Sequence, residues 1–313
     1  MSEKEKVLII GSGPAGYTAA IYASRAGLNP LLISGLEPGG QLTITTDVEN
    51  FPGFENPVQG PWLMEQMRKQ AEAYGTRIMT DYVVNVDFTK DVHKVKTEKK
   101  KIESHTIIIA TGAKAKWLNI DGEEEFRGYG VSACATCDGF FFKDKVVAVV
   151  GGGNTAAEEA LFLSNLCKEV ILIHRRSKLR AEKILQKRLF EKKNIKILWD
   201  TRVKEILGDI KEKRISSILV NDLIRKEDRK VRIDGFFVAI GHSPSTQIFE
   251  KKVSMDSDGY ILTSADSTKT NVDGVFAAGD VTDRIFRQAV TAAGMGCMSA
   301  LEAEVFLTKK KVI

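Results

Sequence analysis

Two of the four cysteines are separated by only two residues, in the segment Cys134-Ala-Thr-Cys137, and Asp138 follows directly. A Cys-x-x-Cys spacing lets the two sulfur atoms close a small disulfide ring, and it commonly lowers one thiol pKa toward neutral pH. The neighbouring carboxylate could move protons as the dithiol forms and breaks. The segment therefore predicts a redox-active cysteine pair with Asp138 as its acid/base.

The cysteine pair has two other interpretations, a zinc site and an incidental pair. A zinc site needs two more ligands, whereas the remaining cysteines, Cys167 and Cys297, are isolated and the four histidines are scattered. The pair could also be incidental. We interpret Cys167 and Cys297 as packing residues, and we expect no metal site.

The chain of 313 residues is long for one hydrophobic core, so two domains are the natural expectation. The N-terminus shows no signal-peptide pattern, and no uninterrupted apolar run approaches the ~18 residues of a membrane span. Four cysteines in such a chain are not a disulfide framework. We expect a soluble, cytoplasmic protein that does not associate with membranes.

Charge excludes one further class of function. The net charge of +5 comes largely from short lysine runs at 99–101 and 309–311, which carry no interleaved aromatic residues. Aromatic residues would be needed as a stacking platform for bases. These runs are typical of solvated surface, and we expect no nucleic-acid partner.

A repeat organises the elements that must position the cysteine pair. Residues 7–10 are apolar and precede Gly-Ser-Gly-Pro-Ala-Gly at 11–16; residues 147–150 are apolar and precede Gly-Gly-Gly-Asn-Thr-Ala at 151–156. In both copies, helical apolar spacing and a second apolar run follow. Each copy therefore predicts the strand, loop, helix and strand of a parallel βαβ unit.

A second pair of landmarks supports a duplication. The apolar strand at 106–112 ends in Thr-Gly, and its counterpart is the strand at 236–241, whereas the strand at 275–280 has no partner in the second copy. Alternating apolar and charged residues predict antiparallel hairpins within 83–102 and 202–233. We predict an α/β fold of two Rossmann-like dinucleotide-binding domains, each a three-layer ββα arrangement, with the second inserted into the first. The first domain would comprise residues 1–115 and 245–313 and the second residues 116–244.

The first glycine loop has the residues that a pyrophosphate site requires. Gly11 makes the tight turn, Gly13 lets backbone N–H groups approach the phosphates, and Gly16 lets helix and strand pack closely. An acidic residue usually ends the second strand to bind the adenosine ribose. That position is Ser34 here, so Glu37 is a displaced candidate.

Gly279-Asp280 favours a flavin over a nicotinamide in the first domain. A carboxylate at the carboxyl edge of the sheet can accept hydrogen bonds from ribitol hydroxyls. The following segment, residues 287–296, is rich in small residues, so it could lie close to a flat ring. The alternative is that Asp280 is a plain helix cap.

The repeat that contains the second glycine loop has different residues after its second strand. Its second strand is followed by His174-Arg175-Arg176, with Arg180 one turn beyond and no acidic residue at the ribose position. Arginines there suit a 2′-phosphate, which they hold through paired charge-assisted hydrogen bonds. The segment predicts NADPH rather than NADH, and the alternative is an exposed basic turn.

Together, these motifs resemble the small bacterial-type thioredoxin reductases over essentially the whole chain. The motifs that carry the resemblance are those at 11–16, 39–42, 48–53, 134–139, 151–155, 174–176, 241–244, 279–280 and 287–289.

The resemblance implies a homodimer in which FAD and NADPH serve a redox-active disulfide that reduces thioredoxin. Cys137 would face the flavin, Cys134 would attack thioredoxin, and the domains would alternate between two orientations. The implied FAD residues are Gly11, Ser12, Gly13, Pro14, Ala15, Gly16, Ser34, Gly35, Glu37, Gly40, Gln41, Asn50, Ala110, Thr111, Gly112, Gly279, Asp280, Arg287, Gln288 and Ala289. The implied NADPH residues are Gly153, Asn154, Thr155, His174, Arg175, Arg176, Arg180, Ile240 and Gly241.

Two related flavoenzymes and one non-enzymatic function are the alternatives. Ferredoxin–NADP reductases of this fold lack the cysteine pair, and peroxidase-linked relatives carry an additional N-terminal thiol domain. The C-terminal residues carry no extra redox motif. A dinucleotide-binding redox sensor would leave Cys134 and Cys137 without a role.

Overall fold

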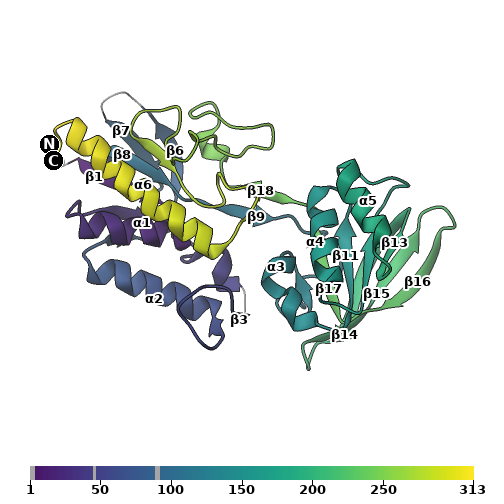
Figure 1. Cartoon of the computed structure of the whole chain (residues 1–313). Helices are drawn as coiled ribbons and strands as arrows, with labels where there is room; N and C mark the ends of the chain where they lie inside the picture. The colour runs from purple at the N-terminus through teal and green to yellow at the C-terminus, as the bar shows by residue number, and fades with distance from the viewer. Residues whose placement is uncertain (1–3, 45–46, 89–91) are drawn as a thin grey trace. The chain divides into compact units, whose positions relative to one another are not determined.

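The computed structural model describes residues 4–44, 47–88 and 92–313. The chain forms two compact units, which are Met1–Lys114 with Ser243–Ile313, and Ala115–His242. The strands at the two crossings, β9 (Ala113–Ala115) and β18 (His242–Pro244), pair with each other. Each unit has its own sheet and its own helices (Figure 1).

The discontinuous unit is built on a mixed sheet with the strand order β5-β2-β1-β8-β7-β6, and β19 pairs with β8. The parallel strands are β1 (Glu5–Ile10), β2 (Leu31–Ile33), β5 (Arg77–Met79), β8 (Lys101–Ile109) and β19 (Val275–Ala277). The antiparallel strands are β6 (Val83–Asp87) and β7 (His93–Thr97), and β3 (Asp47–Val48) pairs with β4 (Val58–Gln59). Short 3-10 turns cover Gly40–Ile44 and Gln247–Phe249.

The alternation of side chains along β1 explains the layers of this unit. Val7 and Ile9 pack against the helical side, whereas Leu8 and Ile10 pack into the cluster on the opposite face. The helices are α1 (Pro14–Arg25), α2 (Gly60–Ala73) and α6 (Ala289–Lys309), and Figure 1 shows α1 lying between α2 and α6.

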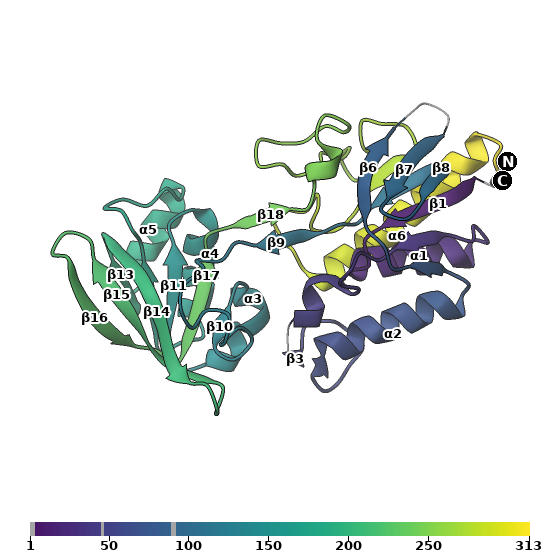
Figure 2. The same ribbon diagram turned by 180° about the vertical axis from the view of Figure 1, so that it is seen from behind.

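The inserted unit repeats this construction, as the reverse view in Figure 2 also shows. Its parallel sheet has the order β10-β17-β11-β12-β13, and Val147 and Val149 pack toward α4 while Ala148 and Val150 pack toward the antiparallel sheet. The parallel strands are β10 (Val131–Ser132), β11 (Val146–Gly151), β12 (Glu169–Ile173), β13 (Ile195–Leu198) and β17 (Gly235–Ala239). The antiparallel strands are β14 (Thr201–Asp209), β15 (Arg214–Asp222) and β16 (Glu227–Arg232), and the helices are α3 (Ala135–Asp138), α4 (Asn154–Ser164) and α5 (Lys183–Glu191). A 3-10 turn covers Gly139–Phe142.

These sheets confirm the prediction of an α/β fold with two Rossmann-like units, and they confirm the antiparallel strands expected within 83–102 and 202–233. The strand, loop, helix and strand predicted for each repeat are β1-α1-β2 and β11-α4-β12.

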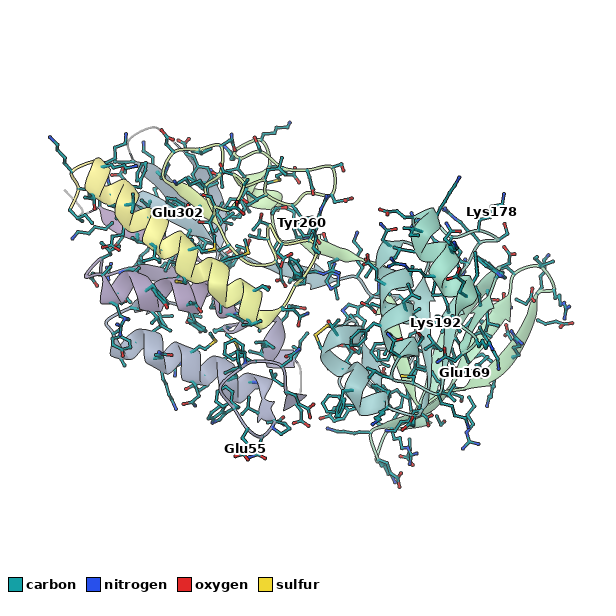
Figure 3. All side chains as sticks on the ribbon, viewed as in Figure 1. Glu55, Glu169, Lys178, Lys192, Tyr260 and Glu302 are labelled. Carbon is teal, nitrogen blue, oxygen red and sulfur yellow. A yellow bond between two sulfur atoms is a disulfide. The ribbon has the colours of Figure 1, made fainter. Side chains whose placement is uncertain are left out.

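Helix α6 differs from one sequence expectation, because by length and composition it could cross a membrane. Its apolar residues are nevertheless interrupted, because Glu302 and Glu304 lie within the helix. The Glu302 side chain is labelled on the ribbon in Figure 3. Its carboxylate accepts hydrogen bonds from the Ser267 hydroxyl at 2.5 Å, the Thr268 N–H at 2.9 Å and the Thr268 hydroxyl at 2.5 Å. These bonds tie the helix to a loop of its own unit.

Candidate functional site

The cysteine pair lies where β10 of the inserted unit ends and α3 begins. Cys134 is the N-cap residue of α3, and it forms a disulfide with Cys137 across a Cα–Cα distance of 5.3 Å. Gly139 lies against α4, since a Cβ there would be 3.0 Å from the Leu163 side chain. The following turn is anchored by Phe142, whose ring packs edge-on against Phe237 at a centroid distance of 5.4 Å. The disulfide loop is therefore fixed to the core of this unit.

Asp138 ends the short helix that carries the disulfide. Burial raises the pKa of its carboxyl, and a hydrogen bond with the Ser132 side chain opposes that rise. A carboxyl whose pKa is raised toward neutral pH suits proton transfer. Sequence reasoning missed Ser132, because a serine two residues before a cysteine carries no signal of its own.

The first glycine loop is held closed by backbone contacts that exclude larger residues. Gly11 has φ of +113°, and a Cβ there would lie 2.2 Å from the Ala110 carbonyl oxygen. A Cβ on Gly16 would lie 2.0 Å from the Gly11 carbonyl oxygen. Gly11 and Gly16 are thus required by the packing of β1, α1 and β8.

The start of α1, by contrast, is open. Gly13 is its N-cap, Pro14 follows in the first turn, and no side chain among the described residues caps the helix. A Cβ on Gly13 would meet no described atom within 4 Å. Free amide groups at an accessible helix N-terminus fit a pyrophosphate.

Ser12 connects the first loop to the segment after β2. Its hydroxyl donates to the Ser34 carbonyl oxygen at 2.7 Å and accepts from the Gly39 N–H at 3.0 Å. Gly40 comes close to Gly13, because a Cβ on Gly40 would lie 3.3 Å from the Gly13 Cα. Ser34 itself is buried, and Glu37 lies in the exposed segment that follows it.

Asp280 follows β19 at the carboxyl end of the same sheet. Burial, and secondarily the charge of Asp283, raise the pKa of the Asp280 carboxyl to about 6, while Arg287 opposes the shift. A cofactor with hydroxyl donors would stabilise such a buried carboxylate, so this residue fits the ribitol chain of FAD.

The fold also joins predicted residues that are far apart in the sequence. The Asn50 side-chain amide donates to Gln288 Oε1 at 3.3 Å, and Gln288 is the N-cap of α6, with Ala289 as its first residue. The Thr111 hydroxyl donates to the Ser245 carbonyl oxygen at 2.8 Å. The predicted positions Ala15, Gly35, Gln41 and Gly112 lie in α1 and in the turns after β2 and β8.

Gly296 was missed by sequence reasoning. It lies inside α6, and a Cβ there would be 2.2 Å from the Ala15 carbonyl oxygen, so α6 approaches α1 at backbone contact. A glycine within a long helix is itself a signal of close approach, since it otherwise costs about 1 kcal/mol relative to alanine.

The second glycine loop repeats this geometry in the inserted unit. A Cβ on Gly151 would lie 2.3 Å from the Ala239 carbonyl oxygen, whereas a Cβ on Gly153, the N-cap of α4, would meet no described atom within 4 Å. Thr155 lies in the first turn of α4. The predicted positions Ile240 and Gly241 come directly after β17, and the Gly241 carbonyl accepts a hydrogen bond from the Lys116 N–H at 3.0 Å.

His174 differs from the other predicted residues because it is 5% exposed. Its Nδ1 lies 2.9 Å from the Gly151 carbonyl oxygen, and its Nε2 lies 3.0 Å from the Lys178 carbonyl oxygen. Both ring nitrogens therefore contact the protein backbone. The ring supports the loop in this structure, whereas the sequence resemblance predicts a direct contact with NADPH.

The three arginines are exposed around this loop. Arg175 and Arg176 follow the end of β12, and the Arg180 N–H donates to the Gly152 carbonyl oxygen at 2.7 Å. Asn154 is tied to Glu182, because its side chain donates to Glu182 Oε1 at 3.1 Å and accepts from the Glu182 N–H at 2.9 Å. The arginine segment and the glycine loop thus lie side by side.

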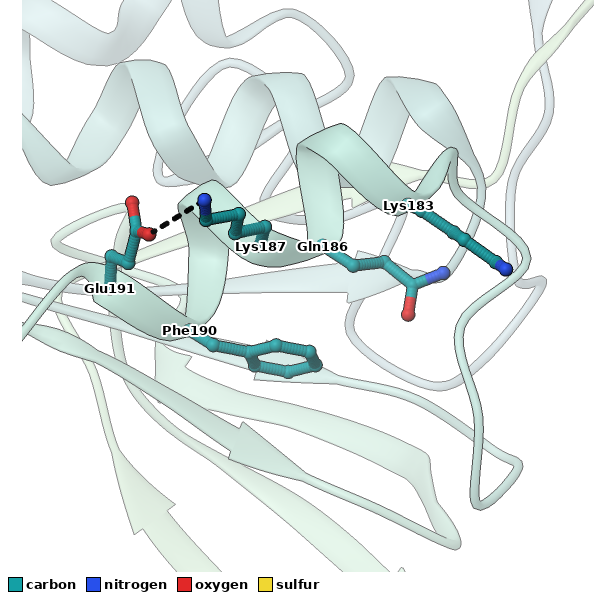
Figure 4. Close-up of a pocket in the computed structure, with 5 residues that line it drawn as sticks. All are labelled: Lys183, Gln186, Lys187, Phe190 and Glu191. Atoms are coloured by element: carbon teal, nitrogen blue, oxygen red, sulfur yellow. Dashed lines mark ion pairs between the residues drawn. The ribbon is translucent and has the colours of Figure 1, made fainter.

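Burial and Asp144 raise the pKa of the Cys167 thiol to about 11, so this cysteine is not a ready nucleophile. Within the described ranges, no group of three or more metal-ligating side chains occurs. Figure 4 shows a shallow groove on α5, lined by Lys183, Gln186, Lys187, Phe190 and Glu191, and these residues all come from one helix.

Comparison with known proteins identifies the family. A model of the pyridine nucleotide-disulphide oxidoreductases matches residues 5–296. The thioredoxin reductase of Rickettsia bellii is 60% identical to this chain, and the match covers 97% of this chain and 98% of the relative. The thioredoxin reductase of Escherichia coli O157:H7 is 49% identical, and the match covers 98% of this chain and 97% of the relative. The solved thioredoxin reductase of Streptococcus pyogenes is 38% identical, covers 99% of this chain and 100% of its own, and superposes with a TM-score of 0.94.

The chain belongs to the pyridine nucleotide-disulphide oxidoreductases, and within them to the thioredoxin reductases. A thioredoxin reductase is an NADPH-dependent flavoenzyme with a redox-active disulfide, so FAD and NADPH are the cofactors of this chain. The geometry of the two loops and of the cysteine pair agrees with that chemistry. Within the described part of the chain, the N-termini of α1 and α4 carry no side-chain cap, so each can accept a pyrophosphate, and the same chain holds the Cys134–Cys137 disulfide.

Proposed function

We propose that this chain transfers reducing equivalents from NADPH through FAD to the Cys134–Cys137 disulfide, and from there to the disulfide of oxidised thioredoxin. The observation that carries the proposal is the disulfide itself, held on the same unit as the arginine-bearing glycine loop. The relatives named above are thioredoxin reductases, and this chain matches them over nearly their full length, which supports thioredoxin as the acceptor.

We assign FAD to the discontinuous domain, residues 1–115 and 245–313, and NADPH to the inserted domain, residues 116–244. The open start of α1 would hold the pyrophosphate of FAD, and Asp280 would accept hydrogen bonds from its ribitol hydroxyls. Bound FAD supplies the two-electron chemistry that links a hydride donor to a disulfide.

In the inserted domain, the open start of α4 would hold the NADPH pyrophosphate, and the exposed Arg175, Arg176 and Arg180 would bind the 2′-phosphate. His174 would act indirectly, by holding the backbone of the arginine segment against the glycine loop.

The cysteine chemistry follows from disulfide exchange. Reduction breaks the bond between Cys134 and Cys137 and adds two electrons and two protons to the sulfurs; a hydride supplies both electrons and one proton, and Asp138 would deliver the other. Cys134 would then lose its proton and attack the thioredoxin disulfide as a thiolate, and Cys137 would displace the reduced thioredoxin from the mixed disulfide in the same way. The two protons of the dithiol pass to the two thioredoxin sulfurs. The two electrons thereby leave with thioredoxin, and the Cys134–Cys137 bond forms again.

Anaerobic titration with NADPH tests this electron path. The wild-type flavoprotein should accept about twice the reducing equivalents of a Cys134→Ser/Cys137→Ser double variant, because only the wild type can store a second electron pair. Equal uptake by the two proteins would show that the thiols lie outside the electron path. NADPH oxidation that depends on added thioredoxin then identifies the acceptor.

We also propose that the enzyme is a cytoplasmic homodimer without membrane or nucleic-acid partners. The Glu302 hydrogen bonds anchor α6 to its own unit and argue against a membrane position, since a carboxylate at the bilayer centre is costly. One face of α6 nevertheless exposes Val290, Met298, Leu301 and Val305. Burial of this stripe by a second copy would remove it from water.

A further inference from the structure

Glu182 lies at the N-cap position of α5, beside the second glycine loop. Its backbone N–H donates to Asn154 Oδ1 at 2.9 Å, and its Oε1 accepts a hydrogen bond from Asn154 Nδ2 at 3.1 Å. Asn154 is the first residue of α4. Glu182 therefore holds both ends of one side-chain amide, at the helix start to which we assign the pyrophosphate of NADPH.

The residues just before Glu182 contact the same loop through their backbone. The Arg180 and Ala181 N–H groups both donate to the Gly152 carbonyl oxygen, at 2.7 and 3.1 Å. Together with the Glu182 N–H, three consecutive backbone amides thus donate to the segment from Gly152 to Asn154. These bonds set the position of the Arg180 backbone relative to the start of α4, whereas the Glu182 carboxylate sets the orientation of the Asn154 side chain.

The orientation of the Asn154 amide matters because its two ends have opposite hydrogen-bonding roles. The nitrogen donates and the oxygen accepts, whereas the oxygens of an ionised pyrophosphate can only accept. The Asn154 oxygen is directed toward the Glu182 backbone, and one Nδ2 proton is directed toward the Glu182 carboxylate. The second Nδ2 proton can then donate to a phosphate oxygen. Without the carboxylate, the amide could turn its oxygen toward the phosphate, which would repel it.

We propose that Glu182 is a positioning residue for NADPH, which fixes Asn154 as a hydrogen-bond donor toward the pyrophosphate. The inference rests on the proposed function, because it concerns the NADPH site assigned there to the inserted domain. Glu182 is exposed, so solvent screens the repulsion between its carboxylate and the cofactor. Among the described residues its side chain forms no capping hydrogen bond with α5, so the carboxylate is not needed to begin that helix.

The substitutions Glu182→Ala and Glu182→Gln separate the hydrogen bond from the charge. Calorimetric titration of the oxidised, FAD-loaded enzyme with NADP⁺ measures affinity without turnover. Glu182→Ala should weaken NADP⁺ binding by about tenfold, because the Asn154 amide loses the acceptor that orients it. Glu182→Gln retains a side-chain oxygen for Asn154 Nδ2 and should bind NADP⁺ with close to wild-type affinity.

A double-variant cycle tests whether Glu182 acts through Asn154. Asn154→Ala alone should weaken NADP⁺ binding, and Glu182→Ala in that background should cause no further loss. Glu191→Ala is the matched control, because Glu191 is an exposed carboxylate at the last residue of α5 and lies 3.9 Å from Lys187 Nζ. The control removes the same charge from the same helix and should keep the wild-type affinity.

Wild-type affinity in Glu182→Ala would overturn the inference, as would tighter binding, which would show that the carboxylate acts by repulsion. Equal losses in Glu182→Ala and Glu182→Gln would assign the effect to charge and would also overturn it. Additive losses in the double variant would contradict action through Asn154.

Failure of the proposed function gives different results. Wild-type affinity in Asn154→Ala would refute the assignment of NADPH to this loop, and the inference with it. If thioredoxin is not the acceptor, the wild type shows no thioredoxin-dependent NADPH oxidation, while the NADP⁺ affinities of the Glu182 variants keep the expected order.

Discussion

The imidazole ring of His174 occupies the space that any side chain at Gly152 would need. A Cβ on Gly152 would lie 2.1 Å from the ring of His174, which is itself held between the carbonyl oxygens of Gly151 and Lys178. The middle glycine of the second loop is therefore required by the protein's own packing. The glycine after it, Gly153, has an open Cβ position among the described residues and leaves room for a ligand.

Replacement of Gly152 by alanine should therefore destabilise the inserted domain even without cofactor. Overpacking of this kind typically costs about 1–3 kcal/mol, and displacement of His174 would also weaken NADPH binding. The thermal midpoint of the NADPH-free enzyme measures the first effect. Gly153→Ala is the control, and its midpoint should equal that of the wild type while its KM for NADPH rises. Equal thermal midpoints for the wild type, Gly152→Ala and Gly153→Ala would contradict the close contact between Gly152 and the His174 ring.

Arg175→Ala and Arg176→Ala should each weaken NADPH use by about tenfold to a hundredfold, because each loses a charge-assisted hydrogen bond to the 2′-phosphate. NADH use should be nearly unchanged, since NADH lacks that phosphate. Steady-state kcat/KM with both cofactors measures the difference. Lys178→Ala changes an exposed cation in the same segment and should affect neither arginine contact. Equal losses for NADPH and NADH would refute the assignment.

Asp280→Asn should change the pH dependence of the unfolding free energy. The folded-state pKa of about 6 lies above the ordinary value of 3.8, so the folded protein retains this proton longer than the unfolded chain does. The flavin-free protein therefore loses stability as pH rises from about 4 to about 6. Denaturant unfolding of deflavinated protein should show a smaller loss over this range for Asp280→Asn than for the wild type.

The same variant should bind FAD more weakly, because an amide replaces the carboxylate that we assign to the ribitol hydroxyls. Fluorescence titration of deflavinated protein with FAD measures this affinity. A wild-type affinity in Asp280→Asn would place the ribitol contact elsewhere, whatever the unfolding curves show.

Leu301→Glu should shift the enzyme from dimer to monomer. Leu301 is 48% exposed on the apolar stripe of α6, and a carboxylate at a covered position would be buried without a partner. Sedimentation equilibrium measures the change, with Glu304→Gln on the same helix as a control for altered charge. A dimer that persists in Leu301→Glu would exclude this stripe as the interface.

Most of the fold was predictable from local pattern. The two glycine loops, the apolar runs before them and the helices after them predicted the βαβ units, because backbone geometry restricts which residues can form each turn. The Cys134–Cys137 pair was equally visible, since its chemistry depends on a spacing within one segment.

Contacts between distant segments were not predictable in this way. No pattern in the sequence indicates that Asn50 bonds Gln288. The glycine at 296 signals a close approach within α6, but no pattern identifies Ala15 as the neighbour. The α6 helix shows the same limit, because Glu302 and Glu304 interrupt its apolar pattern. Only the hydrogen bonds of Glu302 with Ser267 and Thr268 explain how the helix accommodates that carboxylate.

The sequence by itself thus determined the fold class and the spacing of the redox cysteine pair, and it predicted two dinucleotide loops with arginines for a 2′-phosphate. Only the tertiary structure decided how individual side chains serve that chemistry. It holds the His174 ring between the Gly151 and Lys178 carbonyl oxygens, and it brings Asn50 to Gln288. The physical reason is that residue type and spacing limit which reactions are available, whereas burial and hydrogen-bond partners are set by how distant segments pack.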